Sequence, residues 1–161
     1  MNEKKVAVGV PCESNHDKGD VYRVQMVRLK KAVKAGFYYE CIFIEYAMLE
    51  DRLLSVLVHS EVKAEEVKKM SSPVKKISGI RKFVAKKYPA LSQKYFPQTL
   101  LAEVETWAKK RNDLVHALVE RKVTDEELKS VAEEGVDIVK EVKNKVRSFN
   151  RALARQMSAG K

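Results

Sequence analysis

The sequence predicts an all-α fold, a bundle of four to five helices. Apolar residues recur three and four positions apart over long stretches, which is the period of a helix with one buried face. Only four prolines and six glycines occur among 161 residues, which is few for the many turns of an all-β fold. Apart from the short run VAVGV, no segment shows the pattern of a strand.

The N-terminal part is expected to hold two helices after a polar arm. Residues 1–18 should form a flexible arm, and residues 19–161 a single α-helical domain that is long enough to bury a core. The first helix spans about 20–34, and Gly36 marks a bend. The second spans about 37–59 and is apolar on nearly every side, which is typical of a central helix surrounded by others.

Capping signals place the next two helices. The highly charged segment 60–71 reads as an exposed continuation of the second helix or as a linker. Ser72 is a suitable N-cap and is followed by proline, which predicts a third helix that ends near Pro89. Pro97 then opens a fourth helix over about 98–120.

A capping box starts the fifth helix. Thr124 and Glu127 have the required spacing, and the helix is expected to reach about Arg155 unless Gly135 breaks it. A regular spacing of three and four suits packing against another helix, and it is kept by Val139, Val142, Val146, Phe149 and Leu153.

The charge of the chain points to a polyanionic partner. The net charge is +10, from 32 Lys and Arg against 22 Asp and Glu, so nucleic acid, an acidic protein and an anionic membrane surface are the candidate classes. Residues 67–102 contain no acidic residue, and aromatic residues lie among their lysines, which suits RNA. Alternatively, the lysines form a solvated face and the aromatic residues belong to the core. The RNA-binding candidates are Lys75, Lys76, Arg81, Lys82, Lys86, Lys87, Lys109 and Lys110.

Cysteine usage and hydropathy indicate a cytoplasmic protein. Cys12 and Cys41 show no disulfide pattern, and the N-terminus lacks the features of a signal peptide. The most apolar stretch, 37–58, carries five charged side chains, so we expect no membrane span. Cys12 and His16 alone do not make a metal site and no glycine-rich phosphate loop is present, so neither metal nor cofactor is expected.

One arginine stands where the fourth helix should present an apolar residue. The apolar spacing puts Arg111 in the seam between Trp107 and Leu114. A cation there is costly unless its donors are satisfied. One interpretation is a buried ion pair with Glu45 of the second helix, and the other is an arginine held ready to grip a phosphate. Glu45 and Arg52 share a face of the second helix and are candidates for a supporting polar pocket.

Two polar residues follow Arg111 on the same helix. Asn112 and His116 are four positions apart on one face, so the amide can lie beside the imidazole. Arg111 and His116 lie about 140° apart on a helical wheel of about 100° per residue. They can therefore flank one phosphate only in a groove beside the helix, or with help from a second subunit.

The run RNDLVH, residues 111–116, resembles the Arg-x4–6-His motif of the HEPN superfamily. The polar residue directly after the arginine is the kind that this family prefers, and the motif lies on a late helix of a small all-α domain, as it does in the family. The run FIEYAMLEDRL also resembles the acidic helix that often faces the motif. The resemblance covers roughly residues 20–157.

This resemblance implies a dimeric, metal-independent endoribonuclease with a role as a toxin or in phage defence, whose composite active sites form where two subunits meet. Arg111 would hold the phosphate, His116 would transfer protons, and Asn112 would orient the imidazole or a phosphate oxygen. Attack by the ribose 2′-hydroxyl would leave a 2′,3′-cyclic phosphate and a 5′-hydroxyl. Some relatives pair with a nucleotidyltransferase-type antitoxin, which makes such a protein a candidate partner.

Two other functions are compatible with the same residues. The chain is alternatively a catalytically inactive HEPN-like helical module that binds nucleic acid or an acidic partner protein. A third interpretation is a structural helical protein in which Arg111 serves only as a buried ion-pair residue.

Overall fold

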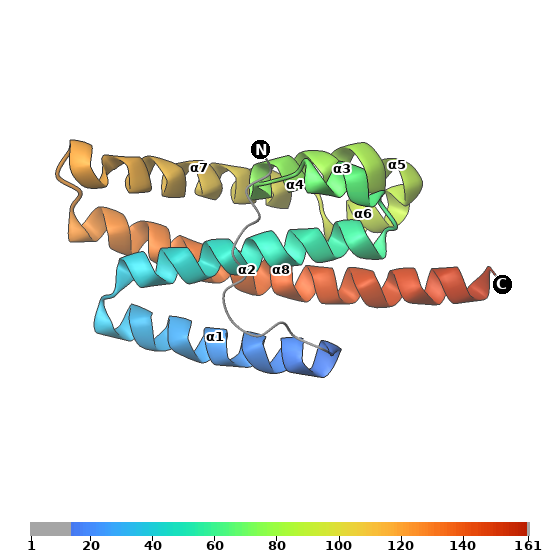
Figure 1. The fold of residues 1–161 in the computed structure, drawn as a ribbon, viewed down its shortest axis with the longest axis horizontal. Coiled ribbons are helices and arrows are strands. Elements are labelled where there is room, and N and C mark those ends of the chain that lie inside the picture. The colour runs from blue at the N-terminus through green and yellow to red at the C-terminus, as the bar shows by residue number, and fades with distance from the viewer. Residues whose placement is uncertain (1–13, 161) are drawn as a thin grey trace.

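The computed structural model describes residues 14–160, and every regular element in that range is helical (Figure 1). The all-α prediction is therefore confirmed for this part of the chain. In order the elements are α1 (Asn15–Ala35), α2 (Tyr38–His59), α3 (Ala64–Lys68), α4 (Pro73–Gly79), the π-helix η1 (Ile80–Val84), α5 (Ala85–Lys87), α6 (Pro89–Tyr95), α7 (Gln98–Glu120) and α8 (Asp125–Ala159).

Four long helices form the body of the bundle. The two central helices, α2 and α8, run side by side in the same direction and share the most extensive contact in the molecule (Figure 1). The helix α1 covers one side of this pair and runs opposite to it, and α7 covers the other side (Figure 1). The shorter helices α3 to α6 gather at the end where α2 finishes.

The first helix begins earlier than the sequence suggested. Ser14 caps α1 through a capping box with Asp17, so the helix starts at Asn15 rather than near Asp20. The last residues of the predicted arm are thus helical, and residues 1–13 of that arm lie outside the described range. At the other end Gly36 adopts a left-handed conformation with φ 77°, which ends α1 and turns the chain into α2.

The middle of the chain is more broken than the single third helix that the sequence predicts. Ser72 caps α4 as expected, its hydroxyl accepting from the Lys75 amide, and the chain stays helical through η1 and α5 to Lys87. Pro89 ends this run and begins α6, because proline fits the first turn of a new helix. The segment predicted as a linker contains the short helix α3.

The last two helices match their capping signals. α7 begins after Pro97, and α8 begins after Thr124, whose hydroxyl and partner Glu127 complete a capping box. Gly135 does not break α8. It is buried, and a Cβ added there would lie 2.1 Å from a Glu45 carboxylate oxygen, so the glycine lets α8 pass close to α2.

A continuous core holds the four long helices together. Its largest fully buried side chains include Trp107 of α7, Phe149 of α8 and Phe96 after α6. The Trp107 indole nitrogen donates a hydrogen bond of 2.9 Å to the Val131 carbonyl oxygen, which fixes α7 against α8. Within residues 14–160, no helix has both the length and the apolar character that crossing a membrane requires.

Candidate active site

The seam arginine of α7 lies against two aromatic rings of α2. The guanidinium carbon of Arg111 is 4.1 Å from the centre of the Tyr46 ring and 5.4 Å from that of Phe43. An aromatic face attracts a cation, so these rings explain how a half-buried arginine is tolerated here. Its Nη1 donates a hydrogen bond of 3.0 Å to Oδ1 of Asn112, while its buried Nε has no partner within residues 14–160.

The ion pair between Arg111 and Glu45 is not formed, so this structural interpretation is wrong in the described fold. Glu45 is completely buried, and neither carboxylate oxygen has a hydrogen-bond partner among residues 14–160. It lies beside Trp107 and Gly135 instead. Burial raises the pKa of the Glu45 carboxyl to about 9, so the group is neutral at pH 7.

Arg111 is consequently a half-buried cation without a carboxylate partner in the described part of the chain. Burial raises the pKa of the Tyr46 hydroxyl, although the positive charge of Arg111 opposes the shift. The phenol therefore stays neutral and supplies no counter-charge. A guanidinium in this condition keeps its full charge and its unused donors for an anion.

His116 lies one turn beyond Asn112 on the same helix, and its side chain is exposed. Five residues of helix separate it from Arg111, which amounts to about 7.5 Å along the axis and about 140° around it. The structure joins Arg111 to Asn112 by a hydrogen bond, but gives His116 no hydrogen bond to either of them within residues 14–160. Within one chain, therefore, the guanidinium and the imidazole leave α7 in different directions.

Apolar side chains are exposed close to this motif. Phe43, which contacts Arg111, has 56% of its surface exposed, and Leu118 and Val119, which follow His116, have 46% and 95% exposed. Exposed apolar side chains of this size can contact another molecule. The residues that carry the resemblance thus have exposed apolar side chains near them on α2 and α7.

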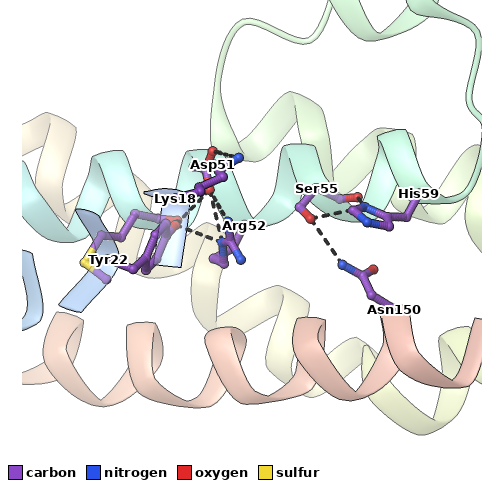
Figure 2. A network of polar contacts seen from close by, with 8 residues as sticks. Lys18, Tyr22, Asp51, Arg52, Ser55, His59 and Asn150 are labelled. Carbon is purple, nitrogen blue, oxygen red and sulfur yellow. Dashed lines mark hydrogen bonds and ion pairs between the residues drawn. The ribbon is translucent and has the colours of Figure 1, made fainter. Parts of the chain in front are cut away.

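The other residue predicted for a supporting pocket lies elsewhere. The side chain of Arg52 packs on Tyr22 of α1, with the guanidinium carbon 4.2 Å from the ring centre, and it is paired with Asp51 (Figure 2). Lys18 binds the other carboxylate oxygen of Asp51 at 2.8 Å. Glu45 and Arg52 therefore do not share a pocket beside Arg111, because each is enclosed by different neighbours.

The basic residues predicted to bind RNA fall into two groups. In the first group, each cation forms an ion pair with a carboxylate of the same chain. Lys76 is only 5% exposed and binds Glu50 and the Met70 carbonyl oxygen, each at 2.8 Å, so its ammonium group does not face solvent. Arg81 binds both carboxylate oxygens of Glu105.

Two further members of that group are paired at the surface, Lys87 with Glu61 and Lys110 with Glu134. In the second group, Lys75, Lys82, Lys86 and Lys109 are exposed and have no carboxylate partner within residues 14–160. The structure therefore does not gather all eight cations into one surface, because acidic residues from other helices neutralise half of them.

A basic groove that the sequence analysis did not single out lies between α1, α2 and α8. It encloses a volume of about 920 Å³, and no carboxylate lines it in the described structure. The sequence does contain a signal for it, since residues 21–39 and residues 142–161 are two further stretches without any acidic residue. That signal becomes visible only when the two stretches are known to face each other.

Comparisons with known proteins add no evidence for or against these site assignments, which therefore rest on the residues of this chain. No protein-family model matches the chain, and neither the curated proteins nor the solved structures provide a match.

Proposed function

We propose that the protein is a metal-independent endoribonuclease of HEPN type. The observation that carries the proposal is the state of Arg111, a half-buried guanidinium held by Tyr46 and Phe43 with no carboxylate partner in the described chain. Packing on the two rings explains how the guanidinium is held, and an arginine with unused donors is suited to a phosphate. The resemblance of RNDLVH to the Arg-x4–6-His motif supports the same reading.

In this proposal His116 exchanges protons with the ribose 2′-hydroxyl and the leaving 5′-oxygen. An imidazole is suited to this at neutral pH because its ordinary pKa lies near 6.5. Arg111 binds the phosphate and stabilises the charge that develops on it, and Asn112, which accepts from Arg111, fixes the guanidinium. The bond between phosphorus and the 5′-oxygen breaks as the 2′-oxygen attacks, leaving a 2′,3′-cyclic phosphate and a 5′-hydroxyl.

The proposal includes a homodimer, because one chain holds Arg111 and His116 on different sides of α7. The exposed apolar residues Phe43, Leu118 and Val119 supply a surface on which a second copy fits. Two motifs facing each other across this surface would let the arginine of one subunit act with the histidine of the other. A toxin or phage-defence role, and a nucleotidyltransferase-type antitoxin as partner, go with this proposal through the family resemblance alone.

The test is incubation of the purified full chain with mixed RNA in the presence of EDTA, followed by identification of the fragment ends. We expect cleavage that persists in EDTA and leaves cyclic phosphate ends. His116→Ala should lose cleavage, whereas His16→Ala, which removes an exposed histidine of α1, should keep it. Both variants should remain helical by circular dichroism. Cleavage that survives His116→Ala would contradict the proposal.

A second candidate function is a catalytically inactive helical module that binds nucleic acid or an acidic protein. The 140° between Arg111 and His116 favours it, because a monomer could direct both groups at one phosphate only if the phosphate lay in a groove beside α7. This alternative predicts RNA affinity that falls steeply with salt but no cleavage by the wild type. Analytical ultracentrifugation separates the two cases further, since the enzyme is expected to be a dimer.

A further inference from the structure

The groove between α1, α2 and α8 concentrates positive charge on two facing walls. Three cations come from α1 and three from α8, and Arg52 of α2 lies at the back. The six wall residues are Lys18, Arg23, Lys30, Lys143, Arg147 and Arg151. A concave surface with a single sign of charge raises the local concentration of anions more than a flat one does.

Much of this charge is not neutralised. Lys18 and Arg52 are paired with Asp51, and Arg23 is paired with Asp20. The remaining four cations, Lys30, Lys143, Arg147 and Arg151, have no acidic group within 4.0 Å among residues 14–160. The groove thus differs from the 67–102 segment, where several of the predicted cations have acidic partners.

The cations of α8 form a row that winds gently around the helix. Lys143, Arg147 and Arg151 are four residues apart, so they lie on one face of the helix and are separated by about 6 Å per step along its axis. A row with this regular spacing fits a linear chain of phosphates better than a single compact anion. Arginine adds specificity for phosphate, because its planar fork donates two parallel hydrogen bonds.

Further hydrogen-bonding side chains line the groove between its basic walls. Asn150 of α8 donates from Nδ2 to Ser55 Oγ of α2 at 3.2 Å, and His59 lies one turn beyond Ser55 with its Nδ1 2.8 Å from the Ser55 carbonyl oxygen (Figure 2). All three line the groove. Ribose hydroxyls and base edges use such donors and acceptors, whereas an acidic peptide or a lipid surface needs mainly charge.

We propose that this groove binds the phosphodiester backbone of single-stranded RNA. This binding site is separate from the proposed ribonuclease site. The groove lies on the α1 side of the central helix pair, whereas Arg111 belongs to α7, which covers the other side (Figure 1). The groove would hold a stretch of RNA at a distance from the motif. Binding there requires no cleavage and stands as a property of its own.

Fluorescence polarisation with a labelled single-stranded RNA tests the groove, using the full chain with His116→Ala so that cleavage cannot intervene. The groove variant combines Lys143→Gln, Arg147→Gln and Arg151→Gln. Its matched control combines Arg28→Gln, Lys31→Gln and Arg155→Gln. These changes also remove one lysine and two arginines, but from exposed positions of α1 and α8 that do not line the groove. Both variants change the net charge equally, and circular dichroism checks that both remain helical.

The groove variant should lose roughly a hundredfold in affinity at about 0.1 M salt, and the slope of log K against log salt should fall by about 2, because each lost phosphate contact on a single strand removes about 0.7. The control should stay within a few-fold of the parent. Equal losses in both variants would overturn the proposal, since net charge alone would then explain binding. The proposal would also be overturned if the protein bound poly-glutamate through this groove and single-stranded RNA failed to displace it.

Discussion

Two half-buried arginines pack on tyrosine rings at almost the same distance, yet they have different surroundings. Arg52 lies 4.2 Å from the Tyr22 ring centre and is paired with Asp51, while Arg111 lies 4.1 Å from the Tyr46 ring centre and has no acidic partner in the described chain. Stacking alone therefore does not say what an arginine does. The carboxylate beside Arg52 makes that arginine part of a polar network between α1 and α2, whereas Arg111 has no such network, which is why we propose it as the phosphate-binding residue.

The largest effect that separates the two arginines is expected in RNA cleavage. Arg111→Ala should lower the cleavage rate by about 10²–10³-fold, because it removes the group that stabilises charge on the phosphate. The same substitution should lower the free energy of unfolding by only about 1 kcal/mol, since it removes the contacts with the two aromatic rings but no ion pair. Single-turnover cleavage and urea denaturation measure the two quantities. A large loss of stability with unchanged cleavage would reverse the assignment of Arg111.

The pH dependence of stability tests whether Glu45 is a neutral buried carboxyl group or a carboxylate paired with Arg111. Burial raises the pKa of Glu45 to about 9, so the folded protein holds a proton that the unfolded chain releases above about pH 4.5. Its contribution to stability is therefore full below that pH and is lost as the pH rises towards 9. At pH 7 the raised pKa of Glu45 makes the protein about 3 kcal/mol less stable than it is below about pH 4.5, at about 1.4 kcal/mol per pH unit.

Glu45→Gln is accordingly expected to flatten the decline in unfolding free energy between about pH 5 and pH 9, and to make the protein more stable at neutral pH. Urea denaturation across this range measures it, with Glu40→Gln, at an exposed position of α2, as the matched control. A carboxylate paired with Arg111 would have a lowered pKa and would give a slope of the opposite sign. A stability that rises with pH and falls on Glu45→Gln would thus contradict the arrangement described here.

Arg52→Ala should mainly affect stability. It leaves the partly buried Asp51 with Lys18 and the Tyr22 hydroxyl as its partners and removes a donor to that hydroxyl, so we expect a loss of about 1–3 kcal/mol in the free energy of unfolding. Thermal and urea denaturation provide the measurement, and Arg28→Ala, at an exposed position of α1, should stay close to the wild type. If Arg52→Ala is equally harmless, the network around Asp51 contributes nothing to the fold.

The smallest difference concerns the two tyrosine hydroxyls. The Tyr22 hydroxyl has two acceptors within reach of its one proton, Asp51 Oδ2 at 2.9 Å and the Met48 carbonyl oxygen at 3.0 Å, and it accepts from Arg52 Nε at 2.9 Å. The Tyr46 hydroxyl has no hydrogen bond within residues 14–160. Tyr22→Phe should cost about 1 kcal/mol of stability, and Tyr46→Phe close to none, because both variants keep the ring under the guanidinium. Equal costs in urea denaturation would show that the hydroxyls do not distinguish the two arginines.

Local signals in the sequence predict the helices well, because caps and prolines act over a few residues. Ser72, Pro97 and Thr124 each mark a helix start that the structure confirms. The exceptions are informative. Glycine is a weak helix former, so Gly135 suggested a possible break in the last helix. The sequence does not show that the Glu45 carboxyl of α2 fills the space where a side chain at position 135 would lie.

The candidate site is predicted less completely, because partners depend on tertiary packing. Sequence spacing identifies Arg111 as unusual, but the choice between Glu45 and an aromatic platform depends on which side of α2 faces α7. The basic groove depends on contacts between helices at opposite ends of the chain, since α1 and α8 are far apart in sequence. Charge counted along the sequence instead emphasised residues 67–102, where salt bridges to other parts of the chain neutralise Lys76, Arg81 and Lys87.

The close passage of α8 over Glu45 limits how this protein can be engineered. Replacing a glycine inside a helix by alanine ordinarily gains up to about 1 kcal/mol, and Gly135 is the one glycine within α8, so it invites that change. Here the added methyl would lie 2.1 Å from a Glu45 carboxyl oxygen and 2.8 Å from the Trp107 ring, so these buried side chains would have to move. Positions 45 and 135 are therefore best redesigned as a pair, with a smaller side chain on α2 accommodating a larger one on α8.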